Sequence, residues 1–165
     1  MTMCTEVVSQ MSQAETGRPT HIFVQAGVGS LAAAVVGYLY NKFQDNPPRF
    51  IIMEPDNAAC ILAWEVLRDF PCCYISCTNF VAANGIRILA NPLPDDAAVE
   101  AGESGSVGIG LLDLLVNNPD FGNLKKALEI GPDSTLLFFN TEGATDPENY
   151  REILWYGKYQ QEDCG

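Results

Sequence analysis

The chain of 165 residues is poor in basic residues, with nine Lys and Arg against 21 Asp and Glu and a net charge of −12. Nucleic-acid backbones require clustered Lys and Arg, and here only Lys125 and Lys126 are adjacent. The composition therefore argues against a nucleic-acid partner. A small phosphate-bearing ligand stays compatible with this charge, because the field that such a ligand meets is set locally by the loop that holds it.

Long hydrophobic runs are also absent. The longest weakly polar run, residues 31–40, is shorter than the ~18 apolar residues that a membrane helix needs, and it contains Gly37. The N-terminus carries Glu6 and no basic cluster before an apolar core, which is not the pattern of a secretory signal. We therefore expect no membrane partner and a cytoplasmic location.

Metal-binding and disulfide patterns are sparse. The chain has one histidine, His21, and its six cysteines form no repeated close pairs; Cys72 and Cys77 have no matching second pair. Zinc sites are typically signalled by recurring C-x-x-C or His spacings. Disulfide frameworks are typical of secreted domains. We predict cysteines with structural or incidental roles and no metal site.

Hydrophobic residues make up 47% of the chain and charged residues 18%, which predicts one folded domain with a sizeable core. Apolar periodicity and turn residues predict alternating helices and strands. The expected helices are 2–15, 30–44, 57–69, 79–90, 105–116, 121–130 and 146–156, and the expected strands are 20–25, 49–53, 73–77 and 135–139. This alternation indicates a single α/β domain over residues 1–165, with an open, mostly parallel twisted sheet covered by helices on both faces.

The most informative segment is residues 20–32, THIFVQAGVGSLA, in which an apolar strand ends in a glycine loop and a helix follows. The N–H groups of a helix's first turn favour an anion, and glycine lets the backbone approach it closely. Gly27-x-Gly29-x-x-Ala32 fits the dinucleotide fingerprint, with Glu54 placed to hold a ribose hydroxyl. A mononucleotide-like or pyridoxal phosphate cup uses the same backbone chemistry. The glycines could also serve only close helix–sheet packing.

Polar and glycine-rich loops follow several predicted strands. Ligands bind at the carboxyl ends of the strands in open α/β sheets, so these loops are expected to meet there. The loops are Gln25–Ser30, Glu54–Asp56 and Asn140–Gly143, and Gly102–Gly105 is a further small-residue turn before a helix. The arrangement favours a binding site, although helix caps and turns use the same residue types.

Five motifs occur in an order that resembles the diaminopropionate ammonia-lyase family, which comprises pyridoxal phosphate (PLP) enzymes of fold type II related to threonine dehydratase and serine racemase. The motifs are QAGVGS, EPDNA, GESGSVGIGLL, NTEGATDPENYRE and WYGK. The resemblance runs from about Cys4 to Lys158 and is to the C-terminal portion of the family. It favours PLP as the cofactor.

The resemblance implies roles for particular residues. One set would cradle the cofactor phosphate, and these residues are Gly27, Val28, Gly29 and Ser30. The turn with Asn140 and Thr141 would meet the pyridine nitrogen, and Glu103 and Ser104 would line the same region. The complete enzyme would eliminate ammonia from the amino acid 2,3-diaminopropionate, giving pyruvate and ammonia, and would form a homo-oligomer. PLP would supply the electron sink.

Two departures from the family matter. Members are more than twice as long, and their N-terminal half supplies the Schiff-base lysine. None of the four lysines here, Lys42, Lys125, Lys126 and Lys158, occupies the matching motif, so we expect no catalytic residue in this chain and no activity of the chain alone. The family also carries a segment of a few dozen residues that we expect to be missing here, near residues 61–62.

Two other readings stay open. The chain could be a Rossmann-like nucleotide-binding module with Glu54 on a ribose, or a non-catalytic remnant that binds a partner chain. In serine racemase relatives the segment matching Glu54 helps to bind a divalent cation together with a later acidic residue. Cys60 stands at that later position, and hard cations prefer oxygen ligands, so we predict no such metal site.

Overall fold

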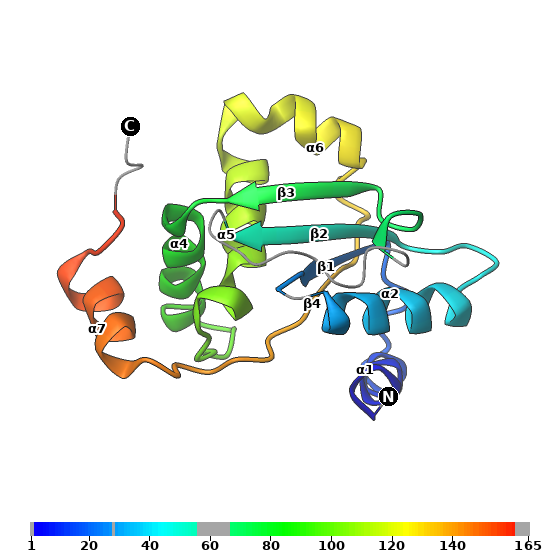
Figure 1. Cartoon of the computed structure of the whole chain (residues 1–165), viewed down its shortest axis with the longest axis horizontal. Helices are drawn as coiled ribbons and strands as arrows, with labels where there is room; N and C mark the ends of the chain where they lie inside the picture. The colour runs from blue at the N-terminus through cyan, green and yellow to red at the C-terminus, as the bar shows by residue number, and fades with distance from the viewer. Residues whose placement is uncertain (1, 28, 56–66, 161–165) are drawn as a thin grey trace.

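A computed structural model describes residues 2–27, 29–55 and 67–160. The strands are interspersed with helices along the chain (Figure 1). Their order is α1 (Thr2–Gln13), β1 (His21–Gln25), α2 (Ser30–Lys42), β2 (Arg49–Pro55), β3 (Cys73–Cys77), α4 (Asn79–Ala90), α5 (Glu103–Asn117), the 3-10 helix η1 (Pro119–Phe121), α6 (Gly122–Leu128), β4 (Leu136–Phe138) and α7 (Pro147–Tyr156).

The four strands form one parallel sheet in the order β3-β2-β1-β4. Strand β1 lies between β2 and β4, and His21 pairs with both Arg49 and Leu136. All five residues of β1 are buried, as its apolar run predicts for a strand covered on both faces. The parallel sheet expected from the sequence is therefore confirmed.

Alternate residues of the strands build two separate cores. Ile22, Val24 and Ile52 pack with residues of α1 and α2 on one face. Phe23, Ile51 and Met53 pack with residues of α4, α5 and α6 on the other. Side chains of a strand point to opposite faces in turn, so each strand contributes to both cores. Helices on both faces are thus confirmed.

Helices α4 and α5 approach each other at the level of their backbones. A Cβ atom added to Gly85 would lie 2.1 Å from the carbonyl oxygen of Ser106, and one added to Gly110 would lie 1.8 Å from that of Val81. Helix α7 in turn packs on α4, where Ile153 lies against Ala83 and Ile86. These three helices therefore form a connected layer that extends beyond the edge of the sheet (Figure 1).

Most expected elements are present with small shifts in their ends. Strand β3 has the bounds predicted for it, whereas α1 ends at Gln13 and β4 is shorter than the predicted 135–139. The expected helix 121–130 is divided into η1 and α6, because Pro119 opens a 3-10 turn first. The expected helix 57–69 lies largely outside the described residues. Within the described part of the chain, no helix is both long and apolar enough to cross a membrane.

Candidate cofactor site at the carboxyl edge of the sheet

A hydrogen bond joins the loops that follow β1 and β4. Strand β1 ends at Gln25, whose Nε2 donates to Oγ1 of Thr141 over 3.1 Å. Gln25 is 8% exposed, so this contact is largely shielded from water. The loops after these two neighbouring strands are therefore brought together at the carboxyl edge, as the sequence predicts.

The glycine loop has the backbone that its sequence requires. Gly27 and Gly29 adopt φ angles of +51° and +89°, in the left-handed region that side chains disfavour. The Gly29 N–H donates to the carbonyl oxygen of Ala26 over 2.7 Å, and the Ala33 N–H donates to that of Gly29 over 2.8 Å. This tight turn leads directly into α2, and Ser30 is the first helical residue. Val28 lies outside the described residues.

The start of α2 fits a phosphate group. Gly29 is the N-cap residue and supplies no side chain to bond the first-turn N–H groups, which are the donors that a helix start leaves unpaired. A Cβ atom on Gly27 would meet nothing within 4 Å, so the loop surface is open there. Uncapped N–H donors and the positive end of the helix dipole are the chemistry that binds phosphate.

Asn140 and Thr141 differ in how far the protein itself uses their side chains. The Asn140 amide is committed on both ends: Nδ2 donates to the carbonyl oxygen of Glu100 over 3.1 Å, and Oδ1 accepts from the Glu142 N–H over 3.3 Å. Thr141 only accepts a hydrogen bond, from Gln25, in the described part of the chain. Its hydroxyl proton is therefore still available to an acceptor.

Glu103 and Ser104 lie in the first turn of α5 rather than in a turn before the helix, which corrects the boundary expected from the sequence. The glycines around them made this segment resemble a loop. Those glycines instead allow close packing, because a Cβ atom on Gly105 would lie 2.2 Å from Oδ1 of Asn140. The Gly102 N–H also donates to the carbonyl oxygen of Glu142 over 2.9 Å. The structure thus places this turn against the loop that follows β4.

The described members of the predicted set all lie at the carboxyl edge, on the two sides of β1: Gly27, Gly29 and Ser30 on the α2 side, and Glu103, Ser104, Asn140 and Thr141 on the α5 side. Sequence reasoning placed Gln25 in the loop but assigned it no contact, and it missed the backbone contact of Glu100. A buried polar residue at the end of an otherwise apolar strand was the available signal for Gln25.

Glu54 is the penultimate residue of β2. Its side chain lies on the same face of the sheet as Ile52, and α2 covers that face. Its Oε2 is buried and has no hydrogen-bond partner among the described residues, and burial raises the pKa of this carboxyl above its ordinary value of 4.5. A ribose-binding carboxylate is expected to be charged and accessible, so the environment of Glu54 does not favour the dinucleotide interpretation. Among the described residues, no group of three or more His, Cys, Asp or Glu side chains could hold a metal ion.

The four lysines lie in ordinary helical or tail positions. Lys42 is in the last turn of α2, and Lys125 and Lys126 are in the last turn of α6. The Lys158 ammonium donates to Oδ1 of Asn149 over 2.8 Å and to Oε2 of Glu152 over 2.6 Å. The Glu152 contact raises the pKa of Lys158, which is opposite to what imine chemistry needs.

Comparison with solved structures defines the class of protein. Holo diaminopropionate ammonia lyase from Escherichia coli superposes with a TM-score of 0.88 at 37% identity, covering 96% of this chain and 46% of that chain. A complex of the E. coli enzyme with an aminoacrylate-PLP azomethine reaction intermediate gives 0.86 at 36% identity, covering 96% and 47%. A PLP-dependent aspartate racemase shares the fold with a TM-score of 0.65 at 13% identity, over 89% of this chain and 49% of that one. The chain therefore has the fold of PLP-dependent enzymes.

Within that class, the chain is similar to diaminopropionate ammonia-lyase, which confirms the resemblance seen in its motifs. Curated relatives of that name are 34% identical over 191 residues in Salmonella typhimurium and 36% identical over 188 residues in E. coli. Each match covers 96% of this chain and 47% of the relative, so the chain spans about half the length of the curated relatives it matches. No family model matches the chain.

Proposed function

We propose that this chain supplies the cofactor-holding part of a PLP-dependent diaminopropionate ammonia-lyase, which removes ammonia from 2,3-diaminopropionate and yields pyruvate. The observation that carries the proposal is the superposition on the holo enzyme over nearly the whole chain. The left-handed Gly29 at the uncapped start of α2 adds independent chemical support, because such a helix start suits a phosphate group. A cytoplasmic location and a homo-oligomeric complete enzyme stay predictions.

Different residues at the carboxyl edge of the sheet would bind different parts of PLP. Gly27, Val28, Gly29 and Ser30 would bind the phosphate through backbone N–H groups. Of the two residues considered for the pyridine nitrogen, we assign Thr141, because its hydroxyl can still donate whereas the Asn140 amide is occupied. Gln25 would orient the Thr141 hydroxyl, and Glu103 and Ser104 would line the site.

PLP, when bound, would act as the electron sink for loss of the β-amino group. The chain's own contribution is to bind the phosphate, to offer a neutral hydroxyl to the ring nitrogen and to keep the turn of α5 against the ring. A lysine poised for imine chemistry would have to come from elsewhere, since the Lys158 ammonium is held by Asn149 and Glu152.

We also propose that residues 1–165 form one α/β domain from which a segment found in the relatives is missing near residues 61–62. The match with the Salmonella relative extends over 191 residues, more than the 165 of this chain, which supports an internal difference in length. Those positions lie outside the described residues, so the support comes from the alignment and the motif order.

A chimera tests the proposal. The matching part of the E. coli enzyme is replaced by this chain, once as it stands and once with the relative's own segment restored between Ile61 and Leu62. We expect the restored chimera to show the visible absorbance band of bound PLP and to release ammonia from 2,3-diaminopropionate. A restored chimera that folds, as judged by circular dichroism, but binds no PLP would overturn the assignment.

A further inference from the structure

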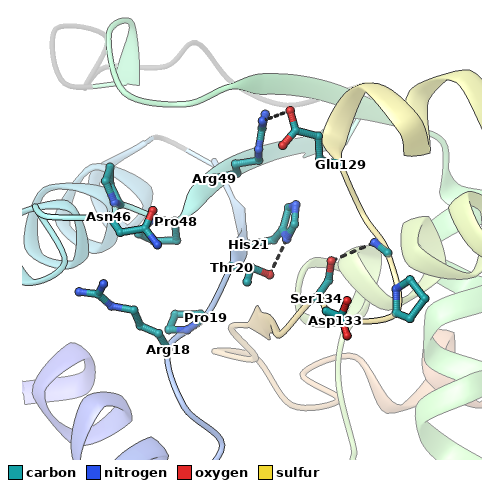
Figure 2. Close-up of a pocket in the computed structure, with 13 residues that line it drawn as sticks. Arg18, Pro19, Thr20, His21, Asn46, Pro48, Arg49, Glu129, Asp133 and Ser134 are labelled. Carbon is teal, nitrogen blue, oxygen red and sulfur yellow. Dashed lines mark hydrogen bonds and ion pairs between the residues drawn. The ribbon is translucent and has the colours of Figure 1, made fainter.

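A cleft of about 420 Å³ lies at the amino-terminal edge of the sheet, the edge opposite the glycine loop. Three loops line it, and each leads into a neighbouring strand: residues 18–21 precede or begin β1, residues 46–49 lead into β2, and residues 129–134 precede β4 (Figure 2). A volume of this size is in the range of small-molecule sites. The cleft is therefore separate from the phosphate-binding loop.

The floor of the cleft is fixed by internal hydrogen bonds. The Thr20 hydroxyl lies 2.7 Å from Nδ1 of His21 and accepts from the Thr135 N–H over 3.0 Å. Nε2 of His21 lies 2.8 Å from the carbonyl oxygen of Leu128. Prolines also line the cleft, and their rings restrict the backbone and present apolar surface; they are Pro19, Pro47, Pro48 and Pro132. The floor and walls of the cleft are thus preformed, so a ligand would have to order few of these residues when it binds.

Charged residues of both signs line the cleft, and one residue of each sign, exposed at its rim, has no polar partner among the described residues. Arg49 and Glu129 form an ion pair with each other. Arg18 and Asp133 make no hydrogen bond or ion pair with any residue that the structure describes. The Arg18 guanidinium lies over the ring of Phe43, 5.1 Å from its centroid, which restrains it while leaving its N–H groups available.

Figure 2 shows Arg18 and Asp133 on opposite sides of the floor formed by Thr20 and His21. A ligand that uses both must carry a negative group at one end and a positive group at the other. A purely anionic ligand would be opposed by Asp133 and by the net charge of −12, and a cationic one by Arg18. The apolar proline walls suit an uncharged middle.

We propose that this cleft binds a linear zwitterion whose carboxylate and ammonium lie several bonds apart, the class of short peptides and ω-amino acids. The carboxylate contacts Arg18 and the ammonium contacts Asp133. The proposal rests on the cleft alone and does not depend on PLP binding or on the elimination reaction.

Saturation-transfer NMR of the full chain with tri-alanine and 6-aminohexanoate tests the proposal, and it works for associated protein as well. We expect saturable binding with a dissociation constant on the order of millimolar, which weakens as salt is added. N-acetyl-tri-alanine and tri-alanine amide, each lacking one end charge, should bind about two- to fivefold more weakly. Absence of saturable binding by both zwitterions, or equal binding of the blocked peptides, would overturn the proposal.

Matched variants locate the site. Arg18→Gln and Asp133→Asn should each weaken the binding of tri-alanine about two- to fivefold. Arg151→Gln and Asp96→Asn remove one charge of the same sign elsewhere on the surface and should leave affinity unchanged. Circular dichroism verifies that all four variants fold. If the cleft variants bind like the control variants, the zwitterion site does not lie between Arg18 and Asp133.

Discussion

Gln25 and Thr141 are 116 positions apart, yet the Gln25 side chain donates a hydrogen bond to the Thr141 hydroxyl. This bond leaves the Thr141 proton facing away from Gln25, because the hydroxyl is the acceptor. In the proposed enzyme, the buried amide therefore selects the orientation in which Thr141 can donate to the cofactor ring. A residue at the end of β1 thus orients a hydroxyl in the loop that follows the neighbouring strand β4.

Gly29→Asp should abolish cofactor binding in the restored chimera. The substitution introduces a side chain at φ +89° and a negative charge at the anion site. Equilibrium titration with PLP, followed by absorbance, gives the affinity. Gly122→Asp is the matched control, since this position at the start of α6 has ordinary helical dihedrals and open space around it. Unchanged affinity in Gly29→Asp would remove the glycine loop from the proposed site.

The chain alone should release no ammonia from 2,3-diaminopropionate above the background given by free PLP. The physical reason is that none of the four lysines stands in a motif that matches the Schiff-base lysine of the resembled family. The hydrogen bond to Glu152 also raises the pKa of Lys158, which is opposite to what imine chemistry needs. Borohydride reduction with PLP followed by peptide mapping is the measurement. A pyridoxyl group fixed stoichiometrically on Lys42, Lys125, Lys126 or Lys158 would contradict this expectation.

Gly85→Ala and Gly110→Ala should each destabilise the fold by about 1–3 kcal/mol or more, since the new methyl group would overlap backbone atoms of the facing helix. Urea denaturation measures the loss. Gly37→Ala is the control: it is a helical glycine of α2 with nothing within 4 Å of the added Cβ, and it should be neutral or stabilise by up to about 1 kcal/mol. Equal effects at all three positions would contradict the close helix contact.

Arg87→Met should loosen α7 from α4. The Arg87 guanidinium donates to the carbonyl oxygens of Ile153 and Lys158, and burial lowers its pKa, as expected for a guanidinium removed from water. We expect a loss of about 1–3 kcal/mol and faster amide exchange in residues 147–156. Arg151→Met, which removes only a surface contact with Trp155, should leave exchange in α7 nearly unchanged.

Glu54→Gln should flatten part of the pH dependence of stability. Burial raises the pKa of Glu54 in the folded state. The contribution of Glu54 to the free energy of unfolding is therefore fully present below pH 4.5, and it is lost as the pH rises through the folded-state pKa. The variant should therefore be more stable than the native chain at neutral pH, with the difference vanishing toward pH 4.5. Denaturation at several pH values measures this, with Asp96→Asn as an exposed control. A constant difference across this range would exclude Glu54 as its source.

Much of the fold was predictable because its signals are local. The apolar run that ends at Gln25 marks the end of β1 within the sequence itself. In the same way, the capping residue before Pro147 marks the start of α7. The parallel sheet follows from the alternation of such elements. Boundaries shifted where two signals competed, as at Gly102–Gly105, where loop-like glycines belong to the start of a helix.

The candidate site was predictable only as a set of loops. Its particular contacts depend on partners far apart in the chain, such as Glu100 with Asn140, and no local pattern encodes them. The helix glycines illustrate the same limit. Their cost to helix propensity is visible in the sequence, whereas their purpose, contact between α4 and α5, appears only when the helices are packed.

The pairing of β2 with β3 bears on the proposed difference in length between this chain and its relatives. The two strands pair in register from Ile51 with Cys73 to Pro55 with Cys77, and residues 56–72 suffice to connect them. A crossover between parallel strands needs only about a dozen residues. If the proposed difference in length lies here, the extra residues of the relatives would elaborate a connection that is already long enough. The order of the strands would then be the same with and without those extra residues.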